Sequence, residues 1–233
     1  MRPRSLLAGA VVSGLLLASP VLAEPLFWGF RAERLEYRLG EDTDGLTWDF
    51  DASVGSDALR VVWRSEADYL TDEDGFEKLE NQGRLQTPIS DFFDAVAGVM
   101  VSTPDGPNRA YGLIGVHGLA PQWFEIDADL FVSNNPFFRL EVDYEGLITN
   151  RIILTPSIEL DLPLTDDEAI GAGAWGPKLE LGARLSYDLI DRTVSPYIGL
   201  HYERLFGQSA DLARDEDEDR ADLFFVVGTR VMF

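Results

Sequence analysis

The sequence predicts an all-β protein, an antiparallel transmembrane β-barrel of about twelve strands that follows a cleavable signal peptide. Three observations lead to this prediction. An apolar segment stands behind two arginines near the N-terminus, apolar and polar residues alternate through almost all of the remaining chain, and an apolar face reaches the last residue. The elements are justified below, beginning with the N-terminal segment.

Residues 1–23 have the features of a secretory signal peptide. Arg2 and Arg4 precede an apolar stretch from Leu6 to Leu17, Pro20 interrupts it, and Ala23 is a small residue at the expected cleavage point. The stretch is shorter than the roughly 20 residues that a membrane-spanning helix needs. We therefore expect an exported chain whose mature part, residues 24–233, is one outer-membrane barrel domain, because no Pro, Gly or Ser-rich linker divides it.

The mature chain is strongly acidic and has no cysteine. Removing residues 1–23 leaves 17 basic against 41 acidic residues. Such a charge disfavours nucleic-acid binding, which requires clustered Lys and Arg, and favours cationic ligands or metals. Without cysteine there is neither a disulfide framework nor a thiolate metal site.

The dominant pattern after Glu24 is a period of two, which places apolar side chains on one face of a strand and polar ones on the other. In residues 46–54, for example, Leu, Trp, Phe, Ala and Val alternate with Thr, Asp, Asp and Ser. The pattern predicts twelve strands, an even number as in single-chain bacterial barrels. Their ranges are 28–39, 46–54, 58–70, 77–87, 92–101, 109–119, 123–133, 137–147, 151–162, 178–189, 194–205 and 222–233.

The connections alternate between tight turns and longer acidic or Gly/Pro-rich loops, of which Gly207 to Asp222 is the longest. Outer-membrane barrels combine short periplasmic turns with longer external loops, so both termini are expected on the periplasmic side. Pro156 and Pro196 fall inside strands, where local bulges are expected. Aromatic girdles are expected from the residues near strand ends, Trp28, Trp48, Trp63, Phe93, Tyr111, Trp123 and Tyr144.

The C-terminal segment from Leu223 to Phe233 has one apolar face that runs to the final residue. This face resembles the outer-membrane assembly signal, and a soluble protein seldom ends on an exposed aromatic residue. In a closed barrel this strand must pair with the first strand near Leu35 to Leu39.

Charged strand residues are expected to face the lumen, because charges facing lipid are costly. Acids outnumber bases in this set, and either an ion-paired interior or a cation-coordinating or conducting interior agrees with it. The residues are Arg60, Arg64, Glu66, Lys78, Glu80, Arg84, Glu125, Asp127, Asp129, Arg139, Glu141, Asp143, Glu159, Asp161, Lys178, Glu180, Arg184, Asp188, His201 and Glu203.

Four of the polar strand residues are candidate metal ligands. His201 and Glu203 stand at i, i+2 and point the same way on one strand, and Asp127 offers hard oxygen ligands. His117 is the fourth candidate, but the glycines of its strand interrupt the alternation, so the sequence does not show which way its side chain points. No catalytic reaction is expected, since an outer-membrane acyl hydrolase needs a serine with the histidine, and no serine is in register with the inward His201.

Several segments resemble the copper resistance protein B family of Gram-negative outer membranes. The matching segments are residues 35–38, the stretch 115–125 that is similar to the family turn GxxGLAPxWFE, residues 154–160 and 196–199, and the loop 206–214. The two prolines inside strands fall within these segments. The resemblance implies outer-membrane copper homeostasis or resistance, with copper ions, outer-membrane lipid and periplasmic copper-handling proteins as partners.

The chain departs from many relatives in one respect. These relatives carry a Met- and His-rich segment before the barrel, whereas Glu24 to Gly29 contain neither residue, and only Met100 and Met232 follow the signal peptide. The leading hypothesis is a copper-homeostasis barrel in which the acidic lumen and the external loops concentrate or pass copper ions. A general cation-selective pore or structural barrel without metal specificity is the alternative, and bilayer conductance separates the two.

Overall fold

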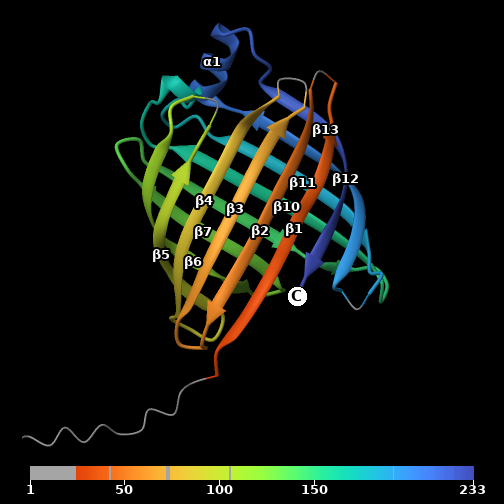
Figure 1. The fold of residues 1–233 in the computed structure, drawn as a ribbon. Coiled ribbons are helices and arrows are strands. Elements are labelled where there is room, and N and C mark those ends of the chain that lie inside the picture. Colours follow the sequence, from red (N-terminus) through yellow and green to blue (C-terminus); the bar gives the residue numbers. More distant parts are fainter. Residues whose placement is uncertain (1–24, 42, 72–73, 105, 191) are drawn as a thin grey trace, which may run out of the picture.

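The computed structural model describes residues 25–233 except 42, 72–73, 105 and 191. These residues form a closed antiparallel barrel (Figure 1). The strands are β1 Phe27–Leu39, β2 Asp44–Gly55, β3 Arg60–Leu70, β4 Gly75–Pro88, β5 Phe93–Ser102, β6 Arg109–Ala120, β7 Phe124–Val132, β8 Phe137–Tyr144, β9 Gly146–Leu147, β10 Ile152–Pro163, β11 Lys178–Tyr187, β12 Val194–Leu205 and β13 Ala221–Met232.

The short strand β9 is a continuation of β8, so the described residues form twelve barrel strands. Both β8 and β9 pair with β10, and the pairs Ser157–Asp143 and Leu154–Gly146 share one register. All twelve predicted strands are present within a few residues of their expected ends. The prediction of an antiparallel twelve-stranded barrel is confirmed.

The barrel closes between its first and last strands, as expected from the sequence. In the β1–β13 ladder, Leu39 lies opposite Phe225 and Tyr37 opposite Val227. A register shift separates this part of the ladder from the pair Arg31–Met232. Every strand therefore has two hydrogen-bonded neighbours, and the sheet has no free edge.

Side chains are distributed in the opposite way to a water-soluble protein. Arg84 and Asp129 point inward and are 1% exposed, whereas Trp63, Ile114 and Leu200 on the outer wall are 48%, 56% and 52% exposed. A continuous apolar outer wall is costly in water but is stable against lipid. The alternation read from the sequence thus corresponds to a polar interior and an apolar exterior.

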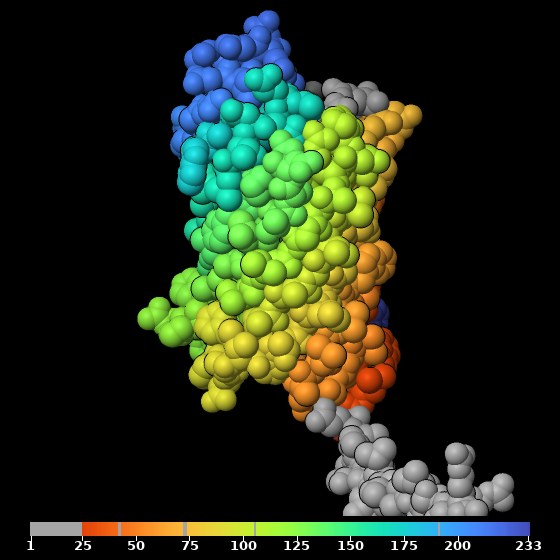
Figure 2. Space-filling view, turned by 90° about the vertical axis from the view of Figure 1, so that its left-hand side faces the viewer, coloured from red at the N-terminus to blue at the C-terminus, as the bar shows by residue number. Residues whose placement is uncertain are grey.

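The two ends of the barrel differ in their connections. The loop end carries the helix α1 (Gly207–Asp215) and the short helix η1 (Glu168–Ile170), and Figure 2 shows the blue segment that contains α1 standing on this end of the barrel. At the turn end β1 begins and β13 ends, where Phe30 and Phe233 exchange backbone hydrogen bonds of 3.1 and 2.8 Å. The sequence predicted only a loop where α1 lies.

The bulges expected at the two prolines are absent. Pro156 lies opposite Ala183 without a register shift, and the ladder toward β8 and β9 is interrupted only opposite Pro156 and its neighbour Thr155. Pro196 pairs regularly with Thr229 on β13. On its other side, the β11–β12 ladder stops one residue short of Pro196, at the pair Ser186–Tyr197. Each proline, which lacks an N–H donor, thus lies where one of its two neighbouring strands is not paired with it, so the missing donor breaks no ladder hydrogen bond on that side.

One expected girdle residue lies inside the barrel. Tyr111 is 6% exposed and forms a luminal apolar cluster with Val96, Met100, Leu113 and Phe131. Its ring packs edge-on against the ring of Phe131, with 6.2 Å between centroids. The glycines of β6 blurred the alternation there, so the inward face of this strand could not be read.

The signal peptide expected at residues 1–23 lies outside the described residues. Within the described part of the chain, no helix is long and apolar enough to cross a membrane.

Candidate functional site

The loop-end half of the lumen contains a cluster of two carboxylates and a histidine. Glu180 on β11 lies directly opposite Glu203 on β12, and His201 is two residues before Glu203 on the same face. Because side chains alternate along a strand, all three point into the lumen. Two like charges directly opposite each other in a ladder repel, so this arrangement requires a cation nearby.

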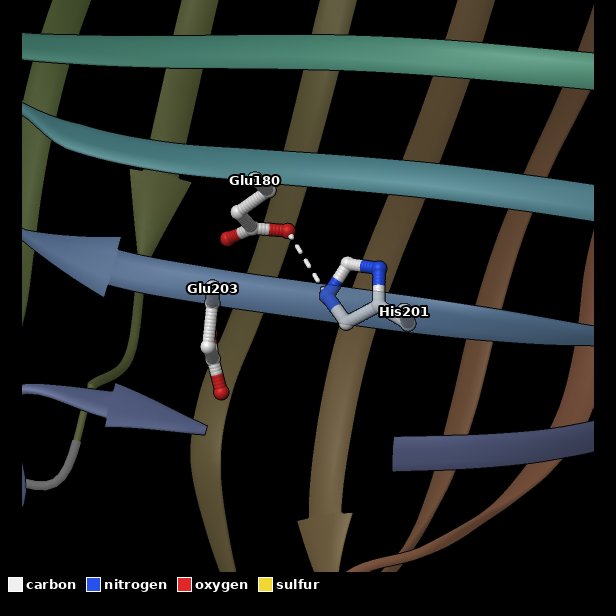
Figure 3. A group of neighbouring side chains, drawn as sticks. All are labelled: Glu180, His201 and Glu203. Atoms are coloured by element: carbon white, nitrogen blue, oxygen red, sulfur yellow. Dashed lines mark ion pairs between the residues drawn. The ribbon is translucent and has the colours of Figure 1, made fainter. Parts of the chain in front are cut away.

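The three side chains are close enough to share one ion. One ligand atom from each lies within 4.8 Å of the others, and among the described residues this is the one group of three or more His, Cys, Asp and Glu with such spacing. The Nε2 atom of His201 is 3.3 Å from Oε2 of Glu180. In Figure 3 the Glu180 carboxylate points toward the His201 ring from the neighbouring strand.

His201 is buried without a satisfied ring nitrogen. Its exposed fraction is 2%. Nδ1 has no hydrogen-bond partner among the described residues, and Nε2 has only the 3.3 Å ion-pair contact with Glu180. A buried polar group without a partner costs roughly 1–3 kcal/mol. A cation bound to Nε2 would remove that cost for one of the two ring nitrogens.

One lysine is shared by the two carboxylates. The Nζ atom of Lys178 is 2.6 Å from Oε2 of Glu203 and 3.1 Å from Oε1 of Glu180. Both Lys178 and Glu180 line a cavity of about 230 Å³ at the loop end. Glu180 and His201 also line a cavity of about 10 Å³ deeper in the lumen. The cluster is therefore reached from the loop end.

The other two candidate ligands lie together, but in a different place. His117 on β6 pairs with Asp127 on β7, and its Nδ1 is 2.9 Å from Oδ2 of Asp127. The same carboxylate accepts hydrogen bonds from Arg84 at 2.9 Å and from Arg64 at 3.4 Å. Both oxygens of Asp127 are thus engaged by cationic or hydrogen-bonding side chains, with which an ion would have to compete.

His117 borders a cavity at the turn end. This cavity measures about 390 Å³, and its charged lining consists of Asp51 and the arginines Arg31, Arg60, Arg64 and Arg192. A cation is repelled by such a lining. The four candidates from the sequence therefore form two pairs, one near each end of the lumen.

Ion pairs fill the lumen between the two ends. Arg64 on β3 contacts Asp51 on the neighbouring strand β2 at 3.1 Å and reaches across the lumen to Glu141 on β8 at 3.4 Å. Around it the described residues leave a cavity of only about 10 Å³, lined by three arginines and seven carboxylates. This volume accommodates about one water molecule. The ion-paired interior, one of the two alternatives from the sequence, is what the structure contains in this layer.

A second ion-paired centre lies nearer the loop end. Arg139 donates two hydrogen bonds of 2.7 Å to Asp161 and one of 2.8 Å to Glu80 on the opposite wall. Such buried pairs need good geometry and additional hydrogen bonds to offset the cost of desolvation. These ion pairs tie β8 to β10 and to β4 across the lumen.

Sequence reasoning placed Glu180 and Lys178 in the lumen but did not select them as part of a site. Their proximity to Glu203 follows from the register of the β11–β12 hairpin, in which Glu180 faces Glu203 and Lys178 faces Leu205. Counting outward from the turn between these strands would have brought the two glutamates together. The periodicity alone gives the face of a residue and not its partner.

Solved structures resemble this barrel in fold. The NanC porin matches with a TM-score of 0.53 and 11% identity, covering 88% of this chain and 99% of that chain. The KdgM porin matches with a TM-score of 0.50 and 11% identity over the same shares. At such low identity the likeness concerns the porin-type barrel fold alone.

Sequence relatives are more informative. The model of the family described as copper resistance protein B precursor matches residues 26–233. Copper resistance protein B from Escherichia coli is 34% identical over 203 residues, which cover 86% of this chain and 68% of that protein. A copper resistance protein B homolog from Pseudomonas syringae pv. tomato is 32% identical over 206 residues, covering 88% and 69%. The chain belongs to the copper resistance protein B family.

Proposed function

We propose that this protein is an outer-membrane barrel of copper resistance that binds a copper ion in the loop-end half of its lumen, with Glu180, His201 and Glu203 as ligands. Membership of the family supports the link to copper. The observation that carries the choice of site is His201, which is buried, has no hydrogen-bonded ring nitrogen and lies beside two carboxylates.

The donor set favours oxidised copper. One imidazole nitrogen and two carboxylate oxygens suit Cu(II), whereas Cu(I) prefers thiolates and thioethers. The thioether of Met100 lies in the apolar cluster of β5, β6 and β7, and Met232 lines the turn-end cavity. A divalent ion also balances the two negative charges of Glu180 and Glu203.

The location follows from the fold and the N-terminal segment. A signal peptide over residues 1–23 would deliver the barrel of residues 24–233 to the outer membrane, with the turn end facing the periplasm and the loop end facing outward. The apolar outer wall would contact lipid. The family resemblance adds periplasmic copper-handling proteins as partners, and no step of this function is catalytic.

The same observations favour a binding barrel over a general cation-selective pore. A steady current needs a continuous water-filled path. The ion-paired layer around Arg64 leaves space for about one water molecule, and the turn-end cavity beyond it is lined by four arginines and one aspartate. A cation that enters from the loop end would meet its ligands before this layer.

Copper stoichiometry of the refolded mature barrel tests the proposal. Equilibrium dialysis against Cu(II) should give one ion for each wild-type barrel and none for His201→Ala. His117→Ala is the matched control, because it removes the other luminal histidine, and it should retain the ion. Loss of binding in the control, or full binding in His201→Ala, would contradict the proposed site.

Copper tolerance of a deletion strain provides the cellular test. Complementation with the wild-type gene or with His117→Ala should restore tolerance, and complementation with His201→Ala should not. Equal tolerance in all strains, including the uncomplemented deletion, would remove the role in resistance.

A further inference from the structure

Lys178 occupies the position that an ion would need in the loop-end cluster. Its ammonium contacts one oxygen of each ligand carboxylate, Oε2 of Glu203 at 2.6 Å and Oε1 of Glu180 at 3.1 Å. The other oxygen of Glu180, Oε2, faces the His201 ring. An ion held by all three side chains must therefore compete with this ammonium for both glutamates.

The electrostatics explain why a cation is built into the site. Two carboxylates face each other across one ladder and are largely shielded from solvent, with side-chain exposures of 14% and 15%. Their mutual repulsion would destabilise the barrel if no cation lay between them. One lysine supplies a single positive charge, so the pair of glutamates keeps a net charge of −1 and still attracts a cation.

Lys178 is also suited to leave its position. It has a flexible four-carbon stem that ends in a compact charge, and 33% of its side chain is exposed. It lines the loop-end cavity, where Glu77 also lies and attracts the ammonium. After displacement, the ammonium would leave Glu180 and Glu203 and would still have the carboxylate of Glu77 nearby to compensate its charge.

We infer that Lys178 is an exchangeable counterion of the copper site, which occupies the two glutamates in the metal-free barrel and is displaced into the loop-end cavity when the ion binds. This inference rests on the proposed function. Lys178 lowers the affinity of the site and thereby keeps binding reversible. It also selects for charge, because a monovalent ion brings no more charge than the ammonium it would replace, whereas a divalent ion does.

Removal of the lysine charge tests the exchange. In Lys178→Met and Lys178→Gln the affinity for Cu(II), measured by competition with a chelator, should rise at least about tenfold over the wild type. Lys178→Arg keeps the charge and should stay near the wild type. Lys78→Met is the comparison variant. Lys78 is the other luminal lysine and also lines the loop-end cavity, but its shortest ion pair, 3.3 Å, is to Glu66, so its removal should raise the affinity less than removal of Lys178.

The outcomes separate this inference from the proposed function. If the wild type binds copper through His201 and both uncharged variants bind with equal or lower affinity, Lys178 is no exchangeable counterion and the site stands. If neither the wild type nor the uncharged variants bind copper, both proposals fail. Binding that appears only after the charge is removed would overturn the exchange, because Lys178 would then block the site in the wild type and would not be displaced by the ion.

The melting temperature of the metal-free barrel tests the selection for charge. When sodium chloride replaces choline chloride at equal ionic strength, Lys178→Met should be stabilised, because a small monovalent ion can then fill the place between the glutamates. The wild type and Lys178→Arg should not respond. An equal response of all three proteins would overturn the selection for charge.

Discussion

The two histidines of the barrel have similar neighbours along the chain and very different surroundings in the lumen. His117 at the turn end makes a hydrogen bond of 2.9 Å with Asp127, and two arginines hold the same carboxylate. His201 at the loop end lies near two glutamates that share one lysine, and it has no hydrogen bond. Each histidine has an acid within reach, but two arginines hold the acid beside His117, whereas the two acids beside His201 share one lysine.

Proximity of a histidine to an acid therefore does not by itself define a metal site. At the turn end, two arginines each donate one hydrogen bond to the carboxylate beside the histidine, and the pair is structural. At the loop end a single ammonium is shared by two carboxylates, so negative charge and an unsatisfied imidazole remain. The balance of charge around each histidine therefore decides which of the two can hold an ion.

The largest expected effect concerns the stability of the turn end. Asp127→Asn removes the charge that binds Arg64, Arg84 and His117 together. Loss of one partner of a buried ion pair costs about 3–5 kcal/mol, and guanidinium unfolding in phospholipid bilayers should show a loss of this size. Copper stoichiometry should not change.

The control for this variant is Glu125→Gln, which removes a luminal carboxylate whose side chain is 37% exposed and pairs with Arg31 at 3.2 Å. Exposed pairs contribute roughly 0–1 kcal/mol, so little stability should be lost. If Asp127→Asn unfolded like this control, or lost its copper, the contrast between a structural and a functional pair would be wrong.

A smaller effect is expected at the loop end. Glu180→Gln removes one ligand, and the affinity for Cu(II) should fall at least about tenfold. Even mutation of a residue that only hydrogen-bonds a metal ligand lowers metal affinity roughly 10- to 100-fold. Its stability should change less than that of Asp127→Asn, because Lys178 keeps Glu203 as its partner at 2.6 Å. Chelator competition measures the affinity, with Glu125→Gln again as the control.

An unchanged affinity in Glu180→Gln would show that the ion is held elsewhere. A fall of the same size in Glu125→Gln would mean that copper responds to the total luminal charge rather than to one site.

Most of the fold could be predicted because the signal is local. The period of two fixes which side chains face lipid, so Trp63 on the outer wall and Glu180 and Arg139 in the lumen were assigned from their own strands. Closure of β13 on β1 followed from the need of every strand for two neighbours. The regular ladders at Pro156 and Pro196 were missed because a missing donor matters only where a partner strand would accept it.

The site was predicted less completely because it depends on contacts between strands. His201 and Glu203 share a strand and were paired correctly as neighbours, whereas Glu180 and Lys178 join them through the β11–β12 register. His117 and Asp127 were selected for their ligand types alone. Their saturation by Arg64 and Arg84 comes from β3 and β4, tens of residues away in the chain, and no local pattern reports such contacts.

Electron paramagnetic resonance of the Cu(II)-loaded barrel tests the central claim most directly. A site built from Glu180, His201 and Glu203 gives hyperfine coupling from one imidazole nitrogen, and this coupling should disappear in His201→Gln and persist in His117→Gln. Coupling from two imidazoles, or a spectrum that His201→Gln leaves unchanged, would contradict the account.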